Sequence, residues 1–308
     1  MDSTLVLSRG NIDRDEITRN DPEALGLARR SPEARFILVS ENSVAVDPKD
    51  NSHLLYLEAK AAREWNSREA VYLGRVGETP YFACDVTDML PDTDVKPAGT
   101  PMMRPIKLWA HEWSADESQL AVIAVCIHNW VRALQYCSRC GEPVAIHPSG
   151  WQAQCENEHQ HFPRTDPACI MAIRDADDRL LLAHNPVWSG KRYSVLAGFV
   201  EAGESAEAAA ARETFEETGV VVDRVEYFGS QPWPFPRSLM LAFRAWTETT
   251  DDEIRIDGIE IADARFFSRE ELSDELRRGK LTLPSRESVA YALIEDWLGV
   301  SVEEVMAR

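Results

Sequence analysis

The chain has 308 residues, of which 44% are hydrophobic and 28% charged, and its formal net charge is −19. That length accommodates two domains and a small third module. The acidic balance disfavours a broad nucleic-acid-binding surface, which needs a basic stripe to displace counterions, but a single nucleotide end could still be read. The most apolar run, Leu120–Ile127, is too short to span a bilayer, and the N-terminus lacks the basic segment of a signal peptide. We therefore expect a cytoplasmic protein that does not bind membranes.

Residues 1–135 are predicted to form an α+β domain. Short apolar runs at 36–39 and 71–73 are separated by turn residues, as in strands. Four prolines within Pro91–Pro105 predict an extended loop. Ser114 and Glu117 have the spacing of a capping box, which opens a helix that ends at about Gln135. This domain carries no recognisable chemistry, so we expect a scaffold or dimerisation domain, with a contribution to substrate binding as the alternative.

Three cysteines mark a small module at residues 136–164. Cys137 and Cys140 form a C-x2-C pair, and Cys155 follows 14 residues later. This spacing is typical of a zinc ribbon. Because a structural zinc site has four protein ligands and no open position, a bound Zn²⁺ here would be structural.

The fourth zinc ligand is the uncertain part of this pattern. Glu158 stands where a complete ribbon would have its fourth cysteine, and His159 comes next, with His147 and His161 also close. Imidazole is a common zinc ligand, so we predict a Cys3His site that uses His159. A degenerate ribbon without metal and three free thiols remain as alternatives.

Residues 165–308 are predicted to form an α/β/α sandwich with a mixed sheet. Strand-like apolar runs and helical segments alternate here, which is typical of this architecture. The expected strands cover residues 169–173, 180–182, 194–196, 221–228 and 239–246, and a final helix covers 285–298.

The most informative segment of the chain is Gly198–Val220, which reads GFVEAGESAEAAAARETFEETGV. It begins with a loop that contains two glycines, which permit unusual backbone angles. Ser205 is placed to cap a helix over 206–218, and Gly219 stands where a left-handed residue ends a helix.

The acidic residues of this predicted helix are candidates for metal binding. Glu213, Glu216 and Glu217 lie three or four positions apart and are neighbours on the helix surface, where like charges destabilise a bare helix. Mg²⁺ or Mn²⁺ would reverse that effect and would be shared with substrate phosphates. The alternative is a solvated acidic face. Glu204 and Arg212, in register before these acids, favour the catalytic interpretation and are predicted to pair, locking the loop against the helix.

A second unusual segment is Ser230–Ser238, in which three prolines alternate with aromatic residues. The prolines make the segment stiff and exclude it from the middle of a sheet. Trp233 and Phe235 would present ordered apolar faces to a flat ligand. The alternative is a rigid surface loop.

These two motifs resemble those of a known family. Gly198–Val220 matches G-x5-E-x7-R-E-U-x-E-E-x-G-U, the signature of the Nudix hydrolases, in which U is a bulky apolar residue; only Thr214 departs from it. Ser230–Ser238 resembles SQPWPFPxS, which marks the NADH pyrophosphatases within that family. Those proteins carry an N-terminal domain and a zinc ribbon in the same order. The chain is thus similar over nearly its whole length to the NudC-type NAD diphosphatases, also described as NAD-cap RNA decapping enzymes.

The resemblance implies an activity and a metal site. It implies hydrolysis of the pyrophosphate of NAD(H) to NMN(H) and AMP, and the same cut on NAD-capped RNA would leave a 5′-monophosphate. Two or three Mg²⁺ or Mn²⁺ ions would neutralise the diphosphate and activate a water. Glu213, Glu216 and Glu217 match the catalytic, metal-binding acids, with the Ala197 carbonyl and Glu260 as further ligands. Spacing does not separate Glu216 from Glu217 as the general base.

The resemblance also implies substrate contacts and a homodimer. A short run of consecutive residues and one helical alanine match the family's substrate-binding positions, and two phenylalanines are candidates to stack on nicotinamide or adenine. They are Phe162, Phe199, Gln231, Pro232, Trp233, Pro234, Phe235, Pro236, Arg237, Ser238 and Ala290. NAD would be a substrate and not a redox cofactor, because no G-x-G-x-x-G loop follows a strand. A Nudix hydrolase of another nucleoside diphosphate, such as ADP-ribose, and a non-catalytic nucleotide sensor are the alternative functions.

Overall fold

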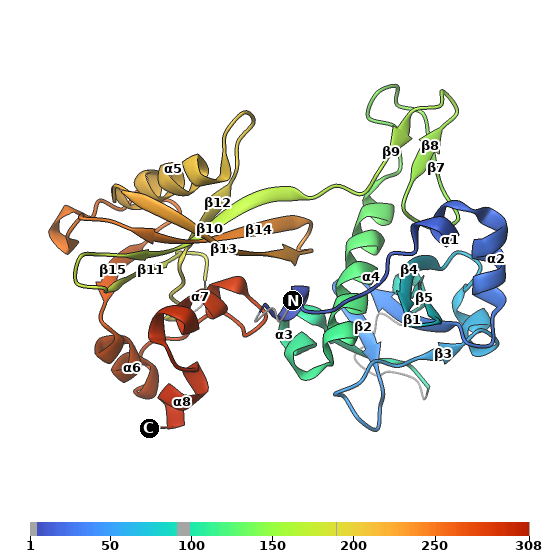
Figure 1. Ribbon diagram of the computed structural model, residues 1–308, viewed down its shortest axis with the longest axis horizontal. Helices are drawn as coiled ribbons and strands as arrows, with labels where there is room; N and C mark the ends of the chain where they lie inside the picture. The colour runs from blue at the N-terminus through green and yellow to red at the C-terminus, as the bar shows by residue number, and fades with distance from the viewer. Residues whose placement is uncertain (1–4, 91–98, 189, 308) are drawn as a thin grey trace. The chain divides into compact units, whose positions relative to one another are not determined.

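A computed structural model describes residues 5–90, 99–188 and 190–307 of the chain (Figure 1). The chain forms two compact units. The first comprises Met1–Thr165 together with Trp233–Arg237, and the second comprises Asp166–Pro232 and Ser238–Arg308. Within the described residues, none of the helices has the length and apolar character needed to cross a membrane. The finer division into 1–135, 136–164 and 165–308 stays a prediction.

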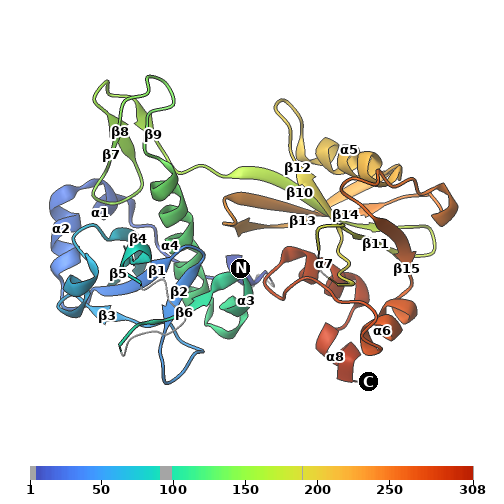
Figure 2. The same cartoon turned by 180° about the vertical axis from the view of Figure 1, so that it is seen from behind.

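The first unit is built on a six-stranded mixed sheet with the order β4-β5-β1-β2-β6, in which β3 also pairs with β1 (Figure 2). β1 and β5 are parallel, and the other pairs are antiparallel. The strands are β1 (Arg35–Ser40), β2 (Ser43–Val46), β3 (Leu57–Glu58), β4 (Val71–Val76), β5 (Thr79–Asp85) and β6 (Met102–Pro105). The predicted strands at 36–39 and 71–73 are therefore confirmed.

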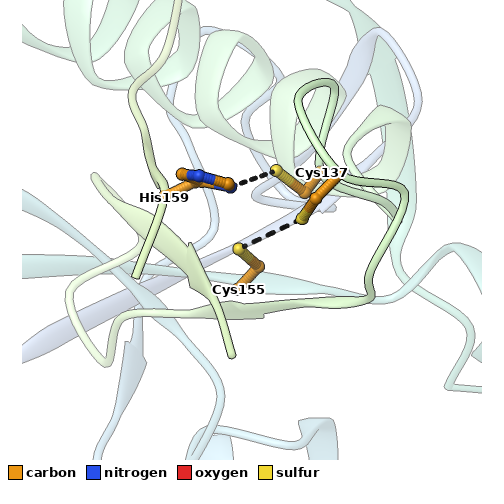
Figure 3. A group of neighbouring side chains, drawn as sticks. Cys137, Cys155 and His159 are labelled. Atoms are coloured by element: carbon orange, nitrogen blue, oxygen red, sulfur yellow. Dashed lines mark hydrogen bonds between the residues drawn. The ribbon is translucent and has the colours of Figure 1, made fainter. Parts of the chain in front are cut away.

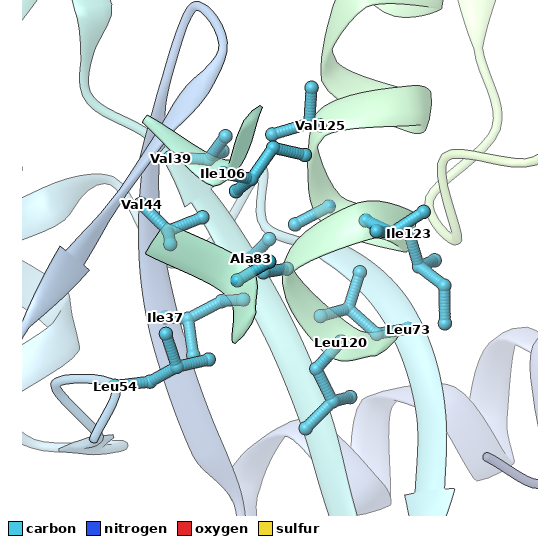
Figure 4. Close-up of a cluster of buried hydrophobic side chains, with 14 of the residues drawn as sticks. Ile37, Val39, Val44, Leu54, Leu73, Ala83, Ile106, Leu120, Ile123 and Val125 are labelled. Carbon is cyan, nitrogen blue, oxygen red and sulfur yellow. The ribbon is translucent and has the colours of Figure 1, made fainter. Parts of the chain in front are cut away.

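Helix α4 (Ala115–Ala133) packs against this sheet, and side chains from the helix and the strands together form the main hydrophobic core of the unit. The predicted capping box is present: the Ser114 hydroxyl accepts from the Glu117 backbone, and the Glu117 carboxylate accepts from the Ser114 backbone. Leu120 and Ile123 of α4 belong to one buried cluster with Ile37 and Leu73 of the sheet (Figure 4). The amphipathic pattern of α4 therefore forms the core of this unit.

The smaller helical segments surround the same sheet. They are η1 (Val6–Ser8), α1 (Glu16–Asn20), α2 (Pro22–Arg30), η2 (Ala61–Trp65), η3 (Thr87–Met89), α3 (Ile106–Trp109) and η4 (Ala110–Glu112).

One expectation for this unit was partly wrong. Of the predicted loop Pro91–Pro105, residues 91–98 lie outside the described residues, but Met102–Pro105 form strand β6 at the edge of the sheet, antiparallel to β2. A strand that ends in proline is tolerated there because an edge strand leaves one side of its backbone unpaired.

The cysteine segment forms its own three-stranded antiparallel sheet within the first unit. It consists of β7 (Val144–Ile146), β8 (Ala153–Cys155) and β9 (Gln160–His161), in the order β7-β8-β9. The Trp151 indole donates to the Tyr72 carbonyl at 2.6 Å and ties this small sheet to β4.

The second unit is a sandwich around a mixed sheet with the order β13-β14-β10-β11-β15, in which β12 pairs with β10. Helices α5 and α7 cover its two faces (Figure 1). The strands are β10 (Asp166–Arg174), β11 (Leu180–His184), β12 (Leu196–Phe199), β13 (Arg224–Trp233), β14 (Ser238–Trp246) and β15 (Asp263–Phe267). The helices are α5 (Ala206–Thr218), η5 (Asp251–Glu253), α6 (Arg269–Arg277), α7 (Val289–Leu298) and α8 (Val302–Ala307).

Some predicted boundaries in this unit were displaced. The third strand begins at Leu196, because Ser194 forms only an isolated bridge to Ala183. The strand expected at 221–228 is β13, which runs on to Trp233 and includes Pro232. This is possible because β13 is an edge strand, so the missing proline N–H need not interrupt the ladder. The last predicted helix begins at Val289 and is capped by Ser288.

Asp15 offers a test of how the first unit is held together. Its carboxylate accepts from the Tyr72 hydroxyl and from the Arg75 guanidinium, both at 2.6 Å. Burial alone would raise the pKa of Asp15, but these hydrogen bonds outweigh it and lower the pKa to about 2. A depressed carboxyl pKa adds stability above the unfolded-state value, and that stability is lost as the pH falls through the folded-state pKa.

We expect Asp15→Asn to lower the free energy of unfolding by roughly 2 kcal/mol at pH 7, the value of a shift of almost two pKa units. The difference from wild type should shrink as the pH falls from about 4 to about 2, as measured by urea unfolding. Glu16→Gln removes the same charge at an exposed neighbouring position and serves as control. Equal effects of the two substitutions would contradict the assignment.

Candidate active site and metal centre

Helix α5 begins and ends where the sequence predicts. The Ser205 hydroxyl accepts from the Ala208 backbone at 3.2 Å. Gly219 has a φ of 71° and donates to the Phe215 carbonyl. Ala209 and Ala210 are fully buried against the sheet, so the small residues of α5 let its backbone approach the strands closely. The acidic residues of α5 are thereby brought to the end of β12.

Arg212 joins the preceding loop to the helix. Its guanidinium contacts both carboxylate oxygens of Glu204 at 2.9 Å and donates to the Phe199 carbonyl at 3.0 Å. It also contacts Glu213 at 3.0 Å and Glu216 at 2.8 Å. A fork that holds one carboxylate with two hydrogen bonds is geometrically specific, unlike an ordinary surface ion pair. The structure thus contains the Glu204–Arg212 pair that the sequence predicts.

Gly198 leaves the space in which the Glu213 carboxylate lies. A Cβ atom at position 198 would stand 1.9 Å from Cδ and 2.3 Å from Oε2 of Glu213. Gly198 is held in β12 by its pairing with Cys169 of β10. The glycine is therefore required by the close approach of a carboxylate to the strand.

Glu217 is the buried acid of the site. It is only 6% exposed, and within the described residues its Oε2 atom has no hydrogen-bond partner. Burial, followed by the negative charges of Glu213, Glu260 and Asp257, raises the pKa of Glu217 to about 8. A buried carboxylate among like charges is costly unless a cation or a proton compensates it.

Glu260 and Asp257 complete this group from the loop after η5. Asp257 accepts backbone hydrogen bonds from Ile259, Glu260 and Ile261, which folds the loop and sets the position of Glu260. The Asp257 backbone donates to the Glu217 carbonyl at 3.2 Å, so the loop is tied to the end of α5. Sequence reasoning found Glu260 but missed Asp257, for which a local Asp-Gly turn was the available signal.

We call Glu213, Glu216, Glu217, Asp257 and Glu260 the acidic cluster. Its chemistry fits a divalent cation, because carboxylate oxygens are the preferred ligands of Mg²⁺ and Mn²⁺ and one buried oxygen has no partner. Two of these carboxylates, those of Glu213 and Glu216, are engaged by the Arg212 guanidinium. Ala197, predicted as a backbone ligand, lies on β12 beside Gly198 and is exposed. These ligand assignments stay predictions.

Phe162 and Phe199, predicted to stack on bases, are 59% and 60% exposed. Each belongs to a different unit and is accessible there. Their aromatic faces are therefore available to a ligand, which is what the prediction requires.

The proline-rich segment is more firmly held than the sequence suggested. Gln231 is fully buried and its amide donates to the Glu287 carbonyl at 2.8 Å. Trp233 and Phe235 form an edge-to-face pair with ring centroids 4.9 Å apart and pack against the core of the first unit. Their apolar faces are thus partly used in packing.

The remaining predicted substrate residues differ in accessibility. Pro236 and Arg237 are exposed, whereas Pro232 and Ser238 are half-buried. Pro234 is buried, and its carbonyl accepts a hydrogen bond from the Asn129 side chain at 3.0 Å. Ala290 is 2% exposed, near the start of α7. Substrate contact by any of these residues stays a prediction.

The predicted zinc ligands come together in the first unit (Figure 3). The ligand atoms of Cys137, Cys140, Cys155 and His159 all lie within 4.8 Å of one another. The Cys137 sulfur is 3.5 Å from His159 Nδ1, and the sulfurs of Cys140 and Cys155 are 3.7 Å apart, too far for a disulfide. Among the alternatives His147 is engaged elsewhere, with Ser149.

Backbone turns shape this cluster. The Arg139 amide donates to the Cys137 sulfur, and Gly141 has a φ of 80°. Hydrogen bonds from the Asn157 side chain and the Glu142 backbone lower the pKa of the Cys140 thiol to about 6. Glu158 also has a positive φ, of 61°, and this turn brings His159 to the position of the fourth ligand. The donor set fits a structural Zn²⁺.

The acidic cluster leads us to expect that replacing Glu217 stabilises the folded protein. Without Mg²⁺ or Mn²⁺, Glu217→Gln should raise the free energy of unfolding at pH 7 by roughly 1–3 kcal/mol, because a neutral amide removes the cost of burying an ionisable carboxyl among like charges. It should also reduce the increase in melting temperature that Mn²⁺ gives to wild type. Differential scanning fluorimetry measures both effects. Glu207→Gln, at an exposed position of the same helix, is the control, and a destabilised, fully Mn²⁺-responsive Glu217→Gln protein would refute the assignment.

The cysteine cluster predicts one zinc ion per chain. Elemental analysis of purified protein should find it, and His159→Ala should lose it together with several degrees of melting temperature, because zinc binding contributes folding free energy. His147→Ala is the matched control and should keep its zinc. Zinc retained after His159→Ala and lost after His147→Ala would assign the fourth ligand to His147 instead.

Comparisons with known proteins agree with this architecture. The family model of the NUDIX domain matches residues 163–290, and that of the NADH pyrophosphatase-like rudimentary NUDIX domain matches residues 33–130. The chain is 37% identical over 307 residues to a NAD-capped RNA hydrolase NudC of Mycobacterium bovis, covering 96% of this chain and 95% of the relative.

Two further relatives carry the same description. The NAD-capped RNA hydrolase NudC of Mycobacterium tuberculosis is also 37% identical, with the same coverage. That of Mannheimia succiniciproducens is 39% identical over 184 residues, which cover 58% of this chain and 66% of the relative. The N-terminal sheet with its long helix and the acidic cluster around Glu217 thus occur in a chain that belongs to the NudC family of Nudix hydrolases.

Proposed function

We propose that the chain hydrolyses the pyrophosphate of NAD(H) to NMN(H) and AMP, and removes the NAD cap from RNA 5′ ends to leave 5′-monophosphate RNA. The observation that carries this proposal is the acidic cluster around the buried Glu217. The proposed substrate is supported by the relatives, because those similar to this chain over nearly its whole length are described as NAD-capped RNA hydrolases.

The acidic cluster accounts for the class of reaction. A diphosphate repels a nucleophile, and the chemistry that divalent cations supply in such a site is neutralisation of phosphate oxygens and activation of the attacking water. Glu213, Glu216, Glu217 and Glu260 would hold Mg²⁺ or Mn²⁺, with the Ala197 carbonyl. Water forms a new O–P bond, the bridging P–O bond breaks, and AMP and NMN(H) separate.

The other side chains of the site position these acids. Arg212 holds Glu204 of the loop and contacts Glu213 and Glu216, so the helix and loop move as one piece. Gly198 keeps space for the Glu213 carboxylate. A proton released by the attacking water goes to a carboxylate, for which Glu216 and Glu217 are the candidates.

Further parts of the proposal rest on the family resemblance. We include in it the homodimer, the cytoplasmic location, the structural zinc and the three-part division of the chain. Phe162, Phe199 and the segment Gln231–Ser238 are the proposed substrate contacts, with Ala290 as a weaker one. Accessible aromatic faces at Phe162 and Phe199 support base stacking.

We expect the purified protein with Mg²⁺ or Mn²⁺ to release NMN from NAD, and Glu217→Gln to lose at least about two orders of magnitude in kcat, a typical cost of removing one essential group. Glu207→Gln should stay within about twofold of wild type. Chromatographic product analysis on NADH, NAD-capped RNA and ADP-ribose makes the measurement.

The same assay separates the competing functions. Faster cleavage of ADP-ribose than of NADH would replace the proposed substrate while keeping the reaction class. Binding of NAD without any cleavage would make the chain a nucleotide sensor. Undiminished turnover by Glu217→Gln would refute the assigned site.

A further inference from the structure

The first unit contains a cavity that has no connection with the acidic cluster. It has a volume of about 950 Å³ and lies among α2, β1 and the segment from Ala59 to Arg68. Four arginines line it, namely Arg29, Arg30, Arg63 and Arg68. The lining includes no aspartate or glutamate, although the chain as a whole carries a net charge of −19. We call this cavity the arginine pocket.

Arg29 is fixed in place by neutral partners. Its guanidinium donates to the carbonyls of Arg68 at 2.7 Å, of Ala70 at 2.9 Å and of Pro148 at 2.9 Å. It also lies over the Phe82 ring, 5.5 Å from the ring centroid. Carbonyl oxygens hold the guanidinium in position but carry no net negative charge. The positive charge of Arg29 is therefore not neutralised by these partners.

The other three arginines are exposed side chains around the same cavity. Over the part of the chain that the structure describes, none of the four arginines forms an ion pair with a carboxylate. Glu69, which follows Arg68 in the chain, accepts from Asn66 of the lining at 2.7 Å. Four positive charges are therefore concentrated around the cavity without an ion pair among the described residues, which raises the local concentration of anions.

The chemistry of the lining selects the class of ligand. A guanidinium offers a planar fork of donors that matches two oxygens of a phosphate. The volume is at the upper end of the roughly 300–1,000 Å³ typical of small-molecule sites, which is larger than one inorganic anion requires. Half-buried Ala59 adds an apolar part to the lining, and Phe36 also borders the cavity but is only 1% exposed. Together these features suit a ligand with phosphate groups and an organic body.

We propose that the arginine pocket binds a phosphate-bearing ligand of nucleotide size, supplied either as a free nucleotide or as the backbone of an RNA chain. No residue of the acidic cluster takes part, so binding here requires neither Mg²⁺ nor Mn²⁺. The proposal goes beyond the hydrolytic function and does not depend on it.

The test measures binding by calorimetry in buffer free of divalent cations. The probes are inorganic pyrophosphate and a ten-nucleotide single-stranded RNA with a 5′-hydroxyl. Arg30→Gln/Arg63→Gln removes two positive charges from the pocket and leaves Arg29 on its carbonyl partners. Lys49→Gln/Arg278→Gln removes two positive charges at exposed positions that are not part of the lining and is the matched control.

We expect wild type to bind at least one probe, the pocket variant to bind it at least about tenfold more weakly, and the control to stay within about twofold. Binding of pyrophosphate alone identifies a free nucleotide as the source, whereas RNA binding that pyrophosphate does not displace identifies the RNA backbone. Equal weakening in both double variants, or no binding of either probe by wild type, would overturn the proposal.

Two further measurements show whether weaker binding by a variant reflects misfolding or loss of hydrolytic activity. Melting temperatures report whether the double variant folds, and Arg68→Gln, which keeps the backbone carbonyl that Arg29 uses, provides a second variant. Hydrolysis of free NAD should stay within about twofold of wild type in all variants. Absence of NAD hydrolysis in wild type would count against the proposed function and leave the binding result intact.

Discussion

The contacts of Arg212 are the interaction on which the site depends. One guanidinium holds both oxygens of Glu204, the carbonyl of Phe199 and the carboxylates of Glu213 and Glu216. Without it, three carboxylates would repel one another at the junction of loop and helix. With it, the loop after β12 and the first acids of α5 form one rigid piece. Of the three glutamates Glu213, Glu216 and Glu217 on α5, Glu217 is the buried one, and over the described residues it makes no ion pair with Arg212.

The burial of Glu217 is made possible by the small residues of the same helix. Ala209 and Ala210 bring α5 close to the sheet, and the hydroxyls of Thr214 and Thr218 donate to carbonyls four residues earlier, at 2.7 and 2.6 Å. Thr214 departs from the apolar residue of the family signature, yet it is fully buried with its hydroxyl satisfied, so the substitution leaves no unpaired polar group. The close packing of α5 against the sheet therefore costs no buried hydrogen bond at these two threonines.

Local sequence signals predicted the local parts of this structure. The bounds of α5, the capping box of α4 and the cysteine cluster depend on residues a few positions apart, and short-range patterns record them. The strand β6 and the extension of β13 through Trp233 depend on pairing with distant strands, which periodicity does not report. The burial of Gln231 and Glu217 and the place of Asp257 likewise depend on tertiary contacts. Asp257 joins the site through a loop that folds back on the end of α5.

The two units interact with phosphate groups through side chains of opposite charge. In the second unit the acidic cluster repels phosphate oxygens, so any diphosphate must arrive with divalent cations, and the carboxylates are useful only because they hold them. In the first unit the arginine pocket attracts the same oxygens directly, because Arg29 is anchored by carbonyls and its neighbouring arginines form no ion pair with a carboxylate of the described residues. A phosphate-bearing ligand can therefore occupy the first unit under conditions in which the second cannot accept it. Removal of Mg²⁺ and Mn²⁺, with the zinc of the cysteine cluster left in place, thus separates the two kinds of binding, since the arginine pocket uses no carboxylate-bound cation.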